Sequence, residues 1–208
     1  MDKSAIVLAG GFSSRFGQDK GLLLLDGKHL AKYALDAVNS VVEERILVVS
    51  SEEQAKNYRK VMDANVNVLV DKTGNPKVQS PLIGTLTGLK EAHGRHSLIL
   101  PCDTPFVSRD VISLLFELAT DRNAVIPRWP NGCIEPLQAV YCSKPACVAA
   151  GSALIEGERN MQAMIDRLCG VRYVSTLVLE QLDPRLETFY NVNNPLDLKR
   201  AEKMLKQR

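Results

Sequence analysis

The sequence predicts an α/β protein: a single-domain, three-layer sandwich built on a mostly parallel, Rossmann-like sheet with one antiparallel hairpin. Apolar runs of strand length alternate with segments of helical periodicity, which is typical of parallel strands joined by helical crossovers. The turn dipeptide Asn131-Gly132, between two apolar runs, indicates the hairpin. The 208 residues suit one domain, and 45% hydrophobic residues allow a sizeable core.

Each apolar run of the first half ends in a turn or leads into a helix. The expected strands lie over residues 5–9, 45–50, 66–70 and 97–101. The expected helices lie over residues 29–42, 51–62, 82–92 and 110–119. A capping box at residues 51–54 and the N-cap residue Ser108 mark helix starts. The stretch 71–81 contains Gly and Pro and is expected to be a loop.

The second half departs from this regular alternation. Apolar runs over residues 125–129 and 134–141 flank the Asn131-Gly132 turn and predict antiparallel pairing. Further elements are expected as helices over residues 145–156 and 160–168, a strand over 171–176 and a last helix from Pro195. No linker or repeat interrupts the chain, so we expect residues 1–208 to form one domain.

Charge and composition exclude several classes of protein. A net charge of +2 does not suggest a nucleic-acid or membrane surface. The sequence has neither a run of about 18 apolar residues nor a signal-peptide layout, so we expect no membrane segment and a cytoplasmic protein. Five cysteines without a C-x-x-C pair favour free thiols over a zinc site. They are Cys102, Cys133, Cys142, Cys147 and Cys169.

A loop rich in small and cationic residues follows the first apolar run. It begins at Gly10-Gly11, contains Arg15 and ends at Lys20, and we call residues 10–20 the phosphate loop. Glycines let backbone N–H groups approach a ligand closely, and the two cations complement a polyphosphate. The glycine spacing fits neither the Walker A pattern nor the dinucleotide fingerprint, so this loop is of another kind.

Polar side chains also stand at the ends of the other expected core strands. Ser50 ends the second strand, Asp71 follows the third, and Asp103 comes after the fourth. Since ligands of such sheets bind outside the carboxyl ends of the strands, we expect these residues to gather beside the phosphate loop. From the residues alone, Asp103 is either a Mg²⁺ ligand or a cap of the turn before Pro105. For Asp71, a cap of the following loop is the simpler interpretation.

Residues 8–25 read LAGGFSSRFGQDKGLLLL and resemble the nucleotidyltransferase signature LAGG-x-S-x-R-x-G-x-D-K-x-L-L. With LAGG and Asp-Lys together, the stretch is most similar to the molybdenum cofactor guanylyltransferase (MobA) family. Shorter matches are PLIG at 81–84, CDTP at 102–105 and NVN at 191–193, and the resemblance extends over residues 8–198. It implies a nucleotide-diphospho-sugar transferase-like fold. The nucleotide-binding half would lie at about 1–107 and the acceptor-binding half at about 108–208.

The resemblance also implies roles for individual residues. Arg15, Lys20 and Asp103 would be catalytic, with Asp103 holding Mg²⁺. The nucleotide-binding residues would be Leu8, Ala9, Gly10, Gly11, Lys20, Ser50, Asp71, Pro81, Leu82, Gly84 and Asp103. The acceptor-binding residues would be Glu135, Asn191 and Asn193.

The chain departs from the family pattern at Ser50 and Ser80. Relatives often have asparagine at the first position, where serine keeps a hydroxyl donor but has a shorter reach, and glycine at the second. Asn191 and Asn193 follow the family, and strand alternation would place both amides on one face, towards a phosphate or metal-bound water. From the residues alone, two turn asparagines are an equal interpretation.

The activity implied by the family is transfer of GMP from GTP to the phosphate of molybdenum-loaded molybdopterin, with release of pyrophosphate. The partners would be GTP, molybdopterin and, beyond them, other cofactor-biosynthesis proteins or apo-molybdoenzymes, with Mg²⁺ as the cofactor. A related nucleotidyltransferase that uses CTP, a sugar phosphate or another phosphate acceptor is the first alternative. A non-catalytic nucleotide-binding carrier is the second, and retention of Arg15, Lys20 and Asp103 argues against it.

Overall fold

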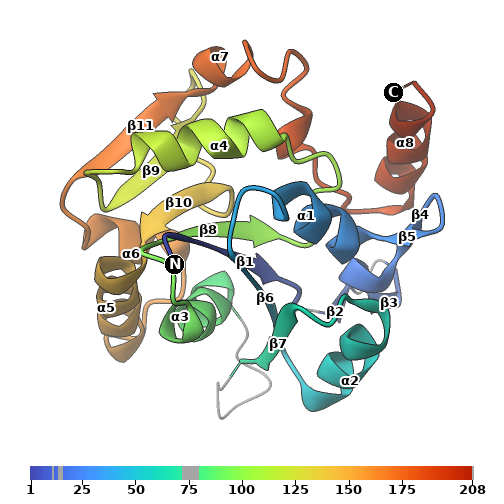
Figure 1. The fold of residues 1–208 in the computed structure, drawn as a ribbon, viewed down its shortest axis with the longest axis horizontal. Coiled ribbons are helices and arrows are strands. Elements are labelled where there is room, and N and C mark those ends of the chain that lie inside the picture. Colours follow the sequence, from blue (N-terminus) through green and yellow to red (C-terminus); the bar gives the residue numbers. More distant parts are fainter. Residues whose placement is uncertain (11, 14–15, 72–79, 208) are drawn as a thin grey trace.

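The computed structural model describes residues 1–10, 12–13, 16–71 and 80–207. Its centre is a seven-stranded sheet in the order β11-β9-β10-β8-β1-β6-β7 (Figure 1). The strands are β1 (Lys3–Leu8), β6 (Glu44–Val49), β7 (Val66–Val70), β8 (His96–Pro101), β9 (Ala124–Arg128), β10 (Ala139–Cys142) and β11 (Val171–Ser175). The predicted α/β class, with a mostly parallel sheet and antiparallel pairing late in the chain, is confirmed.

Strand β1 lies inside the parallel part of the sheet. It pairs with β8 on one side and β6 on the other, so that Ile6 lies between Ile99 and Ile46. Strand β7 continues this part beyond β6. Strand β10 runs antiparallel to both β8 and β9, and β11 is parallel to β9. The carboxyl ends of β8, β1, β6 and β7 therefore follow one another along one edge of the sheet.

Helices cover both faces of this sheet. The helices are α1 (Leu30–Val38), α2 (Glu52–Val61), α3 (Pro81–Glu91), α4 (Arg109–Leu118), α5 (Ser143–Ile155), α6 (Met161–Asp166), α7 (Thr176–Leu179) and α8 (Pro195–Leu205). Helices α1 and α4 lie on one side of the sheet, and α3 and α5 lie on the other (Figure 1). The result is the expected three-layer arrangement, in which each helix buries its apolar face against the sheet.

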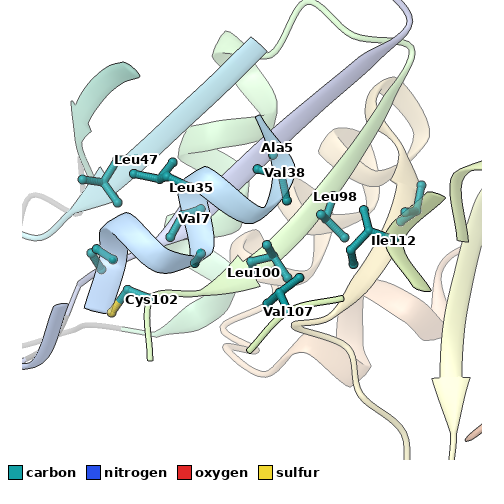
Figure 2. Packing of buried hydrophobic residues seen from close by; sticks show 14 of the residues in the cluster. Ala5, Val7, Leu35, Val38, Leu47, Leu98, Leu100, Cys102, Val107 and Ile112 are labelled. Carbon is teal, nitrogen blue, oxygen red and sulfur yellow. The ribbon is translucent and has the colours of Figure 1, made fainter. Parts of the chain in front are cut away.

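Two apolar cores fill the spaces between these layers. On the α1 face, Leu35 and Val38 pack with Val7 and Leu47, as Figure 2 shows. On the other face, Ile6 packs in a second cluster with residues of α3 and α5. Neighbouring residues of one strand point to opposite faces, so β1 serves both cores. Burial of each such side chain stabilises the fold by about 1.5–3 kcal/mol.

Short elements join β1 to α1 and shape the loop between them. Strands β2 (Phe12–Ser13) and β3 (Gln18–Asp19) pair antiparallel, and the 3₁₀ helix η1 (Lys20–Leu22) follows directly. A small hairpin of β4 (Leu24–Leu25) and β5 (Lys28–His29) then leads into α1. A third apolar cluster holds this region to α8 and the segment before it. Its buried members are Leu23, Leu25, Leu30, Phe106, Val192 and Ala201.

Some predicted elements end earlier than expected. The helix expected over residues 29–42 stops at Val38, because Asn39 and Ser40 favour turns over helix. In the hairpin, Arg128 and Ile134 form only an isolated bridge, and regular pairing with β9 resumes at Val140. Pro136 stands between these points and lacks the N–H that a ladder needs. The segment 189–193 contains the end of the 3₁₀ helix η2 (Glu187–Phe189) and is not a strand.

Two further observations concern the environment of the protein. Within the described residues, no helix combines the length and apolarity needed to cross a bilayer. All five cysteines are free thiols, as the sequence predicts.

Candidate active site

Lys20 and Asp103 meet at the carboxyl edge of the sheet. Lys20 is the last residue of the phosphate loop and the first of η1, and Asp103 follows β8. Lys20 Nζ donates to Asp103 Oδ2 at 2.7 Å and to Asn193 Oδ1 at 3.0 Å. The Lys20 and Asp103 side chains are only 21% and 12% exposed, so water screens this pair less than it would on an open surface. A cation, a carboxylate and an amide from distant parts of the chain thus share one site.

One carboxylate oxygen of Asp103 is available to a cation. Its Oδ2 accepts from Lys20, but the buried Oδ1 has no hydrogen-bond partner among the described residues. The backbone here is fixed, because Val192 N–H donates to the Asp103 carbonyl oxygen at 2.9 Å. A buried carboxylate oxygen without a donor is unfavourable unless a cation or water meets it. Mg²⁺, which prefers oxygen ligands, fits this position.

The donor set around Asp103 suits a metal ion that arrives with a nucleotide. Across the portions of the chain described above, no three His, Cys, Asp or Glu side chains are grouped to hold a metal. Mg²⁺ needs only one or two carboxylates, since phosphate oxygens and water complete its shell. A single carboxylate is therefore enough for Mg²⁺ bound to a triphosphate, but not for a structural zinc site.

Gly10, Ser50 and Asp71 stand at the ends of β1, β6 and β7. A Cβ atom on Gly10 would lie 2.6 Å from Ser50 Oγ, so a larger residue here would force the Ser50 hydroxyl to move. The buried Ser50 Oγ has no hydrogen-bond partner in the described parts of the chain. Burial raises the pKa of the Asp71 carboxyl. Neighbouring strand ends therefore present small or polar groups along the edge that holds Lys20 and Asp103.

The start of α3 contributes mainly packing. Ser80 caps the helix by accepting from Ile83 N–H, and Pro81 takes the first helical position. The Leu82 side chain is fully buried in the core, so a nucleotide there would meet its backbone rather than its side chain. A Cβ atom on Gly84 would lie 3.2 Å from Leu8 Cδ2, which shows that α3 packs closely on the end of β1.

The two amides of the Asn191–Asn193 match have different partners. Asn193 Oδ1 accepts from Lys20 Nζ, whereas Asn191 Nδ2 donates to the Phe189 carbonyl oxygen at 3.2 Å. Because this segment is not a strand, the expected alternation does not apply to it. Of the two amides, it is Asn193 that joins Lys20 and Asp103.

Glu135 lies in the segment that crosses from β9 to β10. Its Oε1 accepts from Trp129 Nε1 at 2.6 Å, and the Trp129 ring packs edge-on against Phe189 at 5.5 Å between centroids. Strand β9 points the same way as β8, since both are antiparallel to β10. The Trp129–Glu135 pair therefore lies at the sheet edge where β8 delivers Asp103, and Phe189 connects it to the segment of Asn193.

The sequence analysis missed side chains that hold the phosphate loop. Asp19 Oδ1 accepts from Tyr58 Oη at 2.6 Å, and Asp19 Oδ2 accepts from Gln54 Nε2 at 2.8 Å. Gln54 and Tyr58 are four residues apart on α2, so they share one helix face. This spacing within the expected helix 51–62 was the available signal, but the sequence does not show which loop that face meets.

The predictions for Gly11 and Arg15 fall outside the described residues. The described parts of the same loop are Gly10, residues 12–13 and residues 16–20. Lys20 is therefore the phosphate-loop cation whose contacts are established here.

Comparisons with known proteins agree with this fold. The family model described as MobA-like NTP transferase domain matches residues 5–172. A probable molybdenum cofactor guanylyltransferase from Methanosarcina mazei is 34% identical over 201 residues, covering 94% of this chain and 88% of that protein. The crystal structure of molybdopterin-guanine dinucleotide biosynthesis protein A from Archaeoglobus fulgidus has a TM-score of 0.82 and 28% identity, covering 99% and 100% of the chains.

A more distant structure shares the fold alone. The 4-diphosphocytidyl-2C-methyl-D-erythritol synthase from Anaerococcus prevotii has a TM-score of 0.71 at 17% identity, covering 100% of this chain and 96% of that one.

The fold and the match to these relatives define a nucleotidyltransferase. Since the family model matches most of the sequence, the chain belongs to the family of MobA-like NTP transferase domains.

Proposed function

We propose that this protein transfers GMP from GTP to the phosphate of molybdenum-loaded molybdopterin, forming a guanine dinucleotide and releasing pyrophosphate. The observation that carries the proposal is the contact at 2.7 Å between Nζ of Lys20, the last residue of the phosphate loop, and Asp103 Oδ2. The names of the relatives from Methanosarcina mazei and Archaeoglobus fulgidus support the choice of guanine and of a molybdopterin acceptor.

The reaction exchanges one phosphorus–oxygen bond for another. An oxygen of the acceptor phosphate attacks the α-phosphorus of GTP in line, and the bond to the bridging oxygen of the β-phosphate breaks. The bridging oxygen leaves with the β- and γ-phosphates as pyrophosphate. The attacking phosphate is already ionised, so the protein does not need a general base. Catalysis then consists of positioning and charge stabilisation.

Each charged residue has a separate part in this scheme. Lys20, together with Arg15, would neutralise the β- and γ-phosphates and the charge that grows on the leaving pyrophosphate. Asp103 would hold Mg²⁺ through Oδ1, the buried oxygen that lacks a partner in the described residues. Bound Mg²⁺ supplies positive charge to the triphosphate oxygens. Asn193 would keep Lys20 in place while the nucleotide enters.

The two substrates would bind to different halves of the chain. GTP would use the nucleotide-binding residues of about 1–107: the phosphate loop, the ends of β1, β6 and β7, and the start of α3. Molybdopterin would bind to residues of about 108–208, namely Glu135, Asn191 and Asn193. The product would pass to apo-molybdoenzymes, and five free thiols are compatible with a cytoplasmic setting.

One alternative has a specific observation in its favour. The 4-diphosphocytidyl-2C-methyl-D-erythritol synthase from Anaerococcus prevotii, whose name contains a cytidyl group, shares this fold. Base choice depends on backbone contacts and pocket shape at the strand ends rather than on Lys20 or Asp103. A protein that uses CTP, or another phosphate acceptor, would therefore keep the same charged pair.

The test is a panel of nucleotides and acceptors with pyrophosphate as the readout. The protein is incubated with Mg²⁺ and GTP, CTP or ATP, each with and without molybdopterin. We expect pyrophosphate only when GTP and molybdopterin are both present. Faster release with CTP would overturn the choice of guanine. Tight GTP binding by calorimetry without pyrophosphate under any condition would instead favour a non-catalytic carrier.

A further inference from the structure

We propose that Gln54 and Tyr58 of α2 are positioning residues for the transfer reaction, which act by holding Asp19 so that the next residue, Lys20, points at Asp103. The inference rests on the proposed function, because it concerns how Lys20 is aimed. It assigns to one helix face a role in turnover that neither the motif nor the family match locates.

Both oxygens of the Asp19 carboxylate accept hydrogen bonds from the protein. Its Oδ1 accepts from Gly21 N–H at 3.0 Å and from Tyr58 Oη at 2.6 Å. Its Oδ2 accepts from Gln54 Nε2 at 2.8 Å. Hydrogen bonds to an ionised carboxylate are stronger and more directional than neutral ones. Asp19 is therefore an internal anchor of the loop rather than a ligand of the nucleotide or the metal.

Gln54 combines a helix cap with a contact to the loop. Ser51 caps α2 by accepting from Gln54 N–H at 3.2 Å. The Oε1 atom of the Gln54 side chain accepts a hydrogen bond from Ser50 N–H at 2.8 Å. Its amide group remains free to donate to Asp19 through Nε2. Glutamate would cap this helix equally well but has no donor for Asp19, so only the amide joins the end of β6 to the phosphate loop.

Tyr58 fixes the other side of the same anchor. Its side chain is fully buried, and burial raises the pKa of its hydroxyl, which therefore stays a proton donor. A Cβ atom on Gly21 would collide with Tyr58 Oη and lie 3.2 Å from Cys102 Sγ. The loop is thus pressed against α2 and against the residue that precedes Asp103.

These contacts leave Lys20 little freedom of direction. Asp19, the residue before Lys20, accepts through Oδ1 from Tyr58 Oη. The same Oδ1 accepts from the N–H of Gly21, the residue after Lys20. Asp19 also pairs through its backbone with Phe12. The Lys20 side chain leaves this fixed turn and reaches Asp103 and Asn193. Displacing a catalytic group by about 1 Å can lower a rate about a hundredfold, so the anchor should matter for turnover.

The test uses substitutions that change the contacts with little change in volume. Gln54→Glu keeps the oxygen that accepts from Ser50 but sets a second carboxylate against Asp19. Tyr58→Phe keeps the buried ring and removes only the hydroxyl. Matched controls are Gln162→Glu, whose amide also donates to a carboxylate, and Tyr33→Phe, whose hydroxyl donates to a carbonyl oxygen outside this network. Turnover, KM for GTP and the thermal midpoint are measured for each.

We expect Gln54→Glu and Tyr58→Phe to lower kcat at least about tenfold, while the controls keep it. A double variant, Asp19→Asn with Gln54→Glu, exchanges donor and acceptor across the same contact. The amide introduced at position 19 could still accept from Gly21 and Tyr58, and it could donate to the carboxylate introduced at position 54. This variant should therefore regain most of the lost turnover. In a Lys20→Ala background, Gln54→Glu should cause little further loss, because both changes remove one function.

Wild-type turnover in folded Gln54→Glu would overturn the inference, as would full additivity with Lys20→Ala. If Tyr58→Phe does not fold, Gln54→Glu and its rescue decide the question. Failure of the proposed function is distinguishable, because wild type itself would then release no pyrophosphate with GTP and molybdopterin. In that case weaker GTP binding by Gln54→Glu in calorimetry, with Gln162→Glu unchanged, would still support the anchor, and unchanged binding would refute it.

Discussion

Lys20 and Asp103 are 83 positions apart in the sequence, yet their side chains form an ion pair at 2.7 Å. The pairing follows from the sheet, because β1 and β8 are parallel neighbours and deliver their carboxyl ends side by side. The lysine balances the charge of the carboxylate in this pair. A Mg²⁺-bound triphosphate would supply new partners to both residues, a cation for Asp103 and phosphate oxygens for Lys20.

Gly21 should be needed for both stability and turnover. In Gly21→Ala, the new methyl group would meet Tyr58, Ala31 and Cys102, and such overpacking costs about 1–3 kcal/mol. We expect a lower free energy of unfolding in urea and a loss of turnover that exceeds what the unfolded fraction explains. Unchanged turnover in the folded variant would contradict the role given to this turn.

Glycines elsewhere in the fold provide matched controls for that experiment. Gly88→Ala would push against Ile6 in the core, so it should destabilise by about 1–3 kcal/mol and leave the kcat of folded protein unchanged. Gly151 lies inside α5 with open space where its Cβ would be, so Gly151→Ala should stabilise by about 0.5–1 kcal/mol. Urea unfolding of both variants measures the free energy of unfolding, which should fall in Gly88→Ala and rise in Gly151→Ala.

Asp71 should lower the stability of the protein at neutral pH. Burial raises the pKa of its carboxyl above the usual value of 3.8, so the folded state disfavours the ionised form. The loss of stability from the ionised Asp71 is present at pH values above its raised pKa, and it disappears as the pH falls through that pKa towards 3.8. Asp71→Asn should therefore raise the thermal midpoint at pH 7, by an amount that shrinks towards pH 4, and weaken GTP binding in calorimetry. A lower midpoint at pH 7 would contradict this argument.

Trp129 should report on acceptor binding. It is the one tryptophan of the chain, and its Nε1 donates to Glu135, an acceptor-binding candidate. Molybdopterin should change the tryptophan emission, whereas GTP alone should change it little. Glu135→Ala should raise KM for the acceptor about tenfold or more, as expected for a lost hydrogen bond to a charged group, with KM for GTP unchanged. An equal rise in both KM values would place Glu135 outside the acceptor site.

Much of the fold could be predicted because local pattern and global packing agree. Residues 98–101 of the strand predicted over 97–101 are all apolar, and β8 is indeed covered on both faces. Lys20 and Asp103 could be placed together because parallel strands deliver their ends to one edge. Their contact depends on chain order and strand direction, which the sequence pattern expresses well.

Other features depend on contacts that no local pattern encodes. The hydrogen bonds from Gln54 and Tyr58 to Asp19 join one face of α2 to the phosphate loop. Helical periodicity shows that these two residues share a face, but not which loop that face contacts. The different partners of Asn191 and Asn193 depend on a segment that is irregular rather than extended. Pro136 interrupts the predicted hairpin because it has no N–H to donate.

The central claim is that Lys20 and Asp103 act on one bound nucleotide, and pyrophosphate release tests it most directly. Release from GTP, Mg²⁺ and molybdopterin is measured for wild type, Lys20→Ala and Asp103→Ala, with Lys32→Ala as a control for loss of an exposed lysine in a surface ion pair. Each of the first two variants should lose at least about a hundredfold in turnover, as expected for one charged transition-state contact, and the control should keep wild-type turnover. Near-wild-type turnover in both Lys20→Ala and Asp103→Ala would contradict the account.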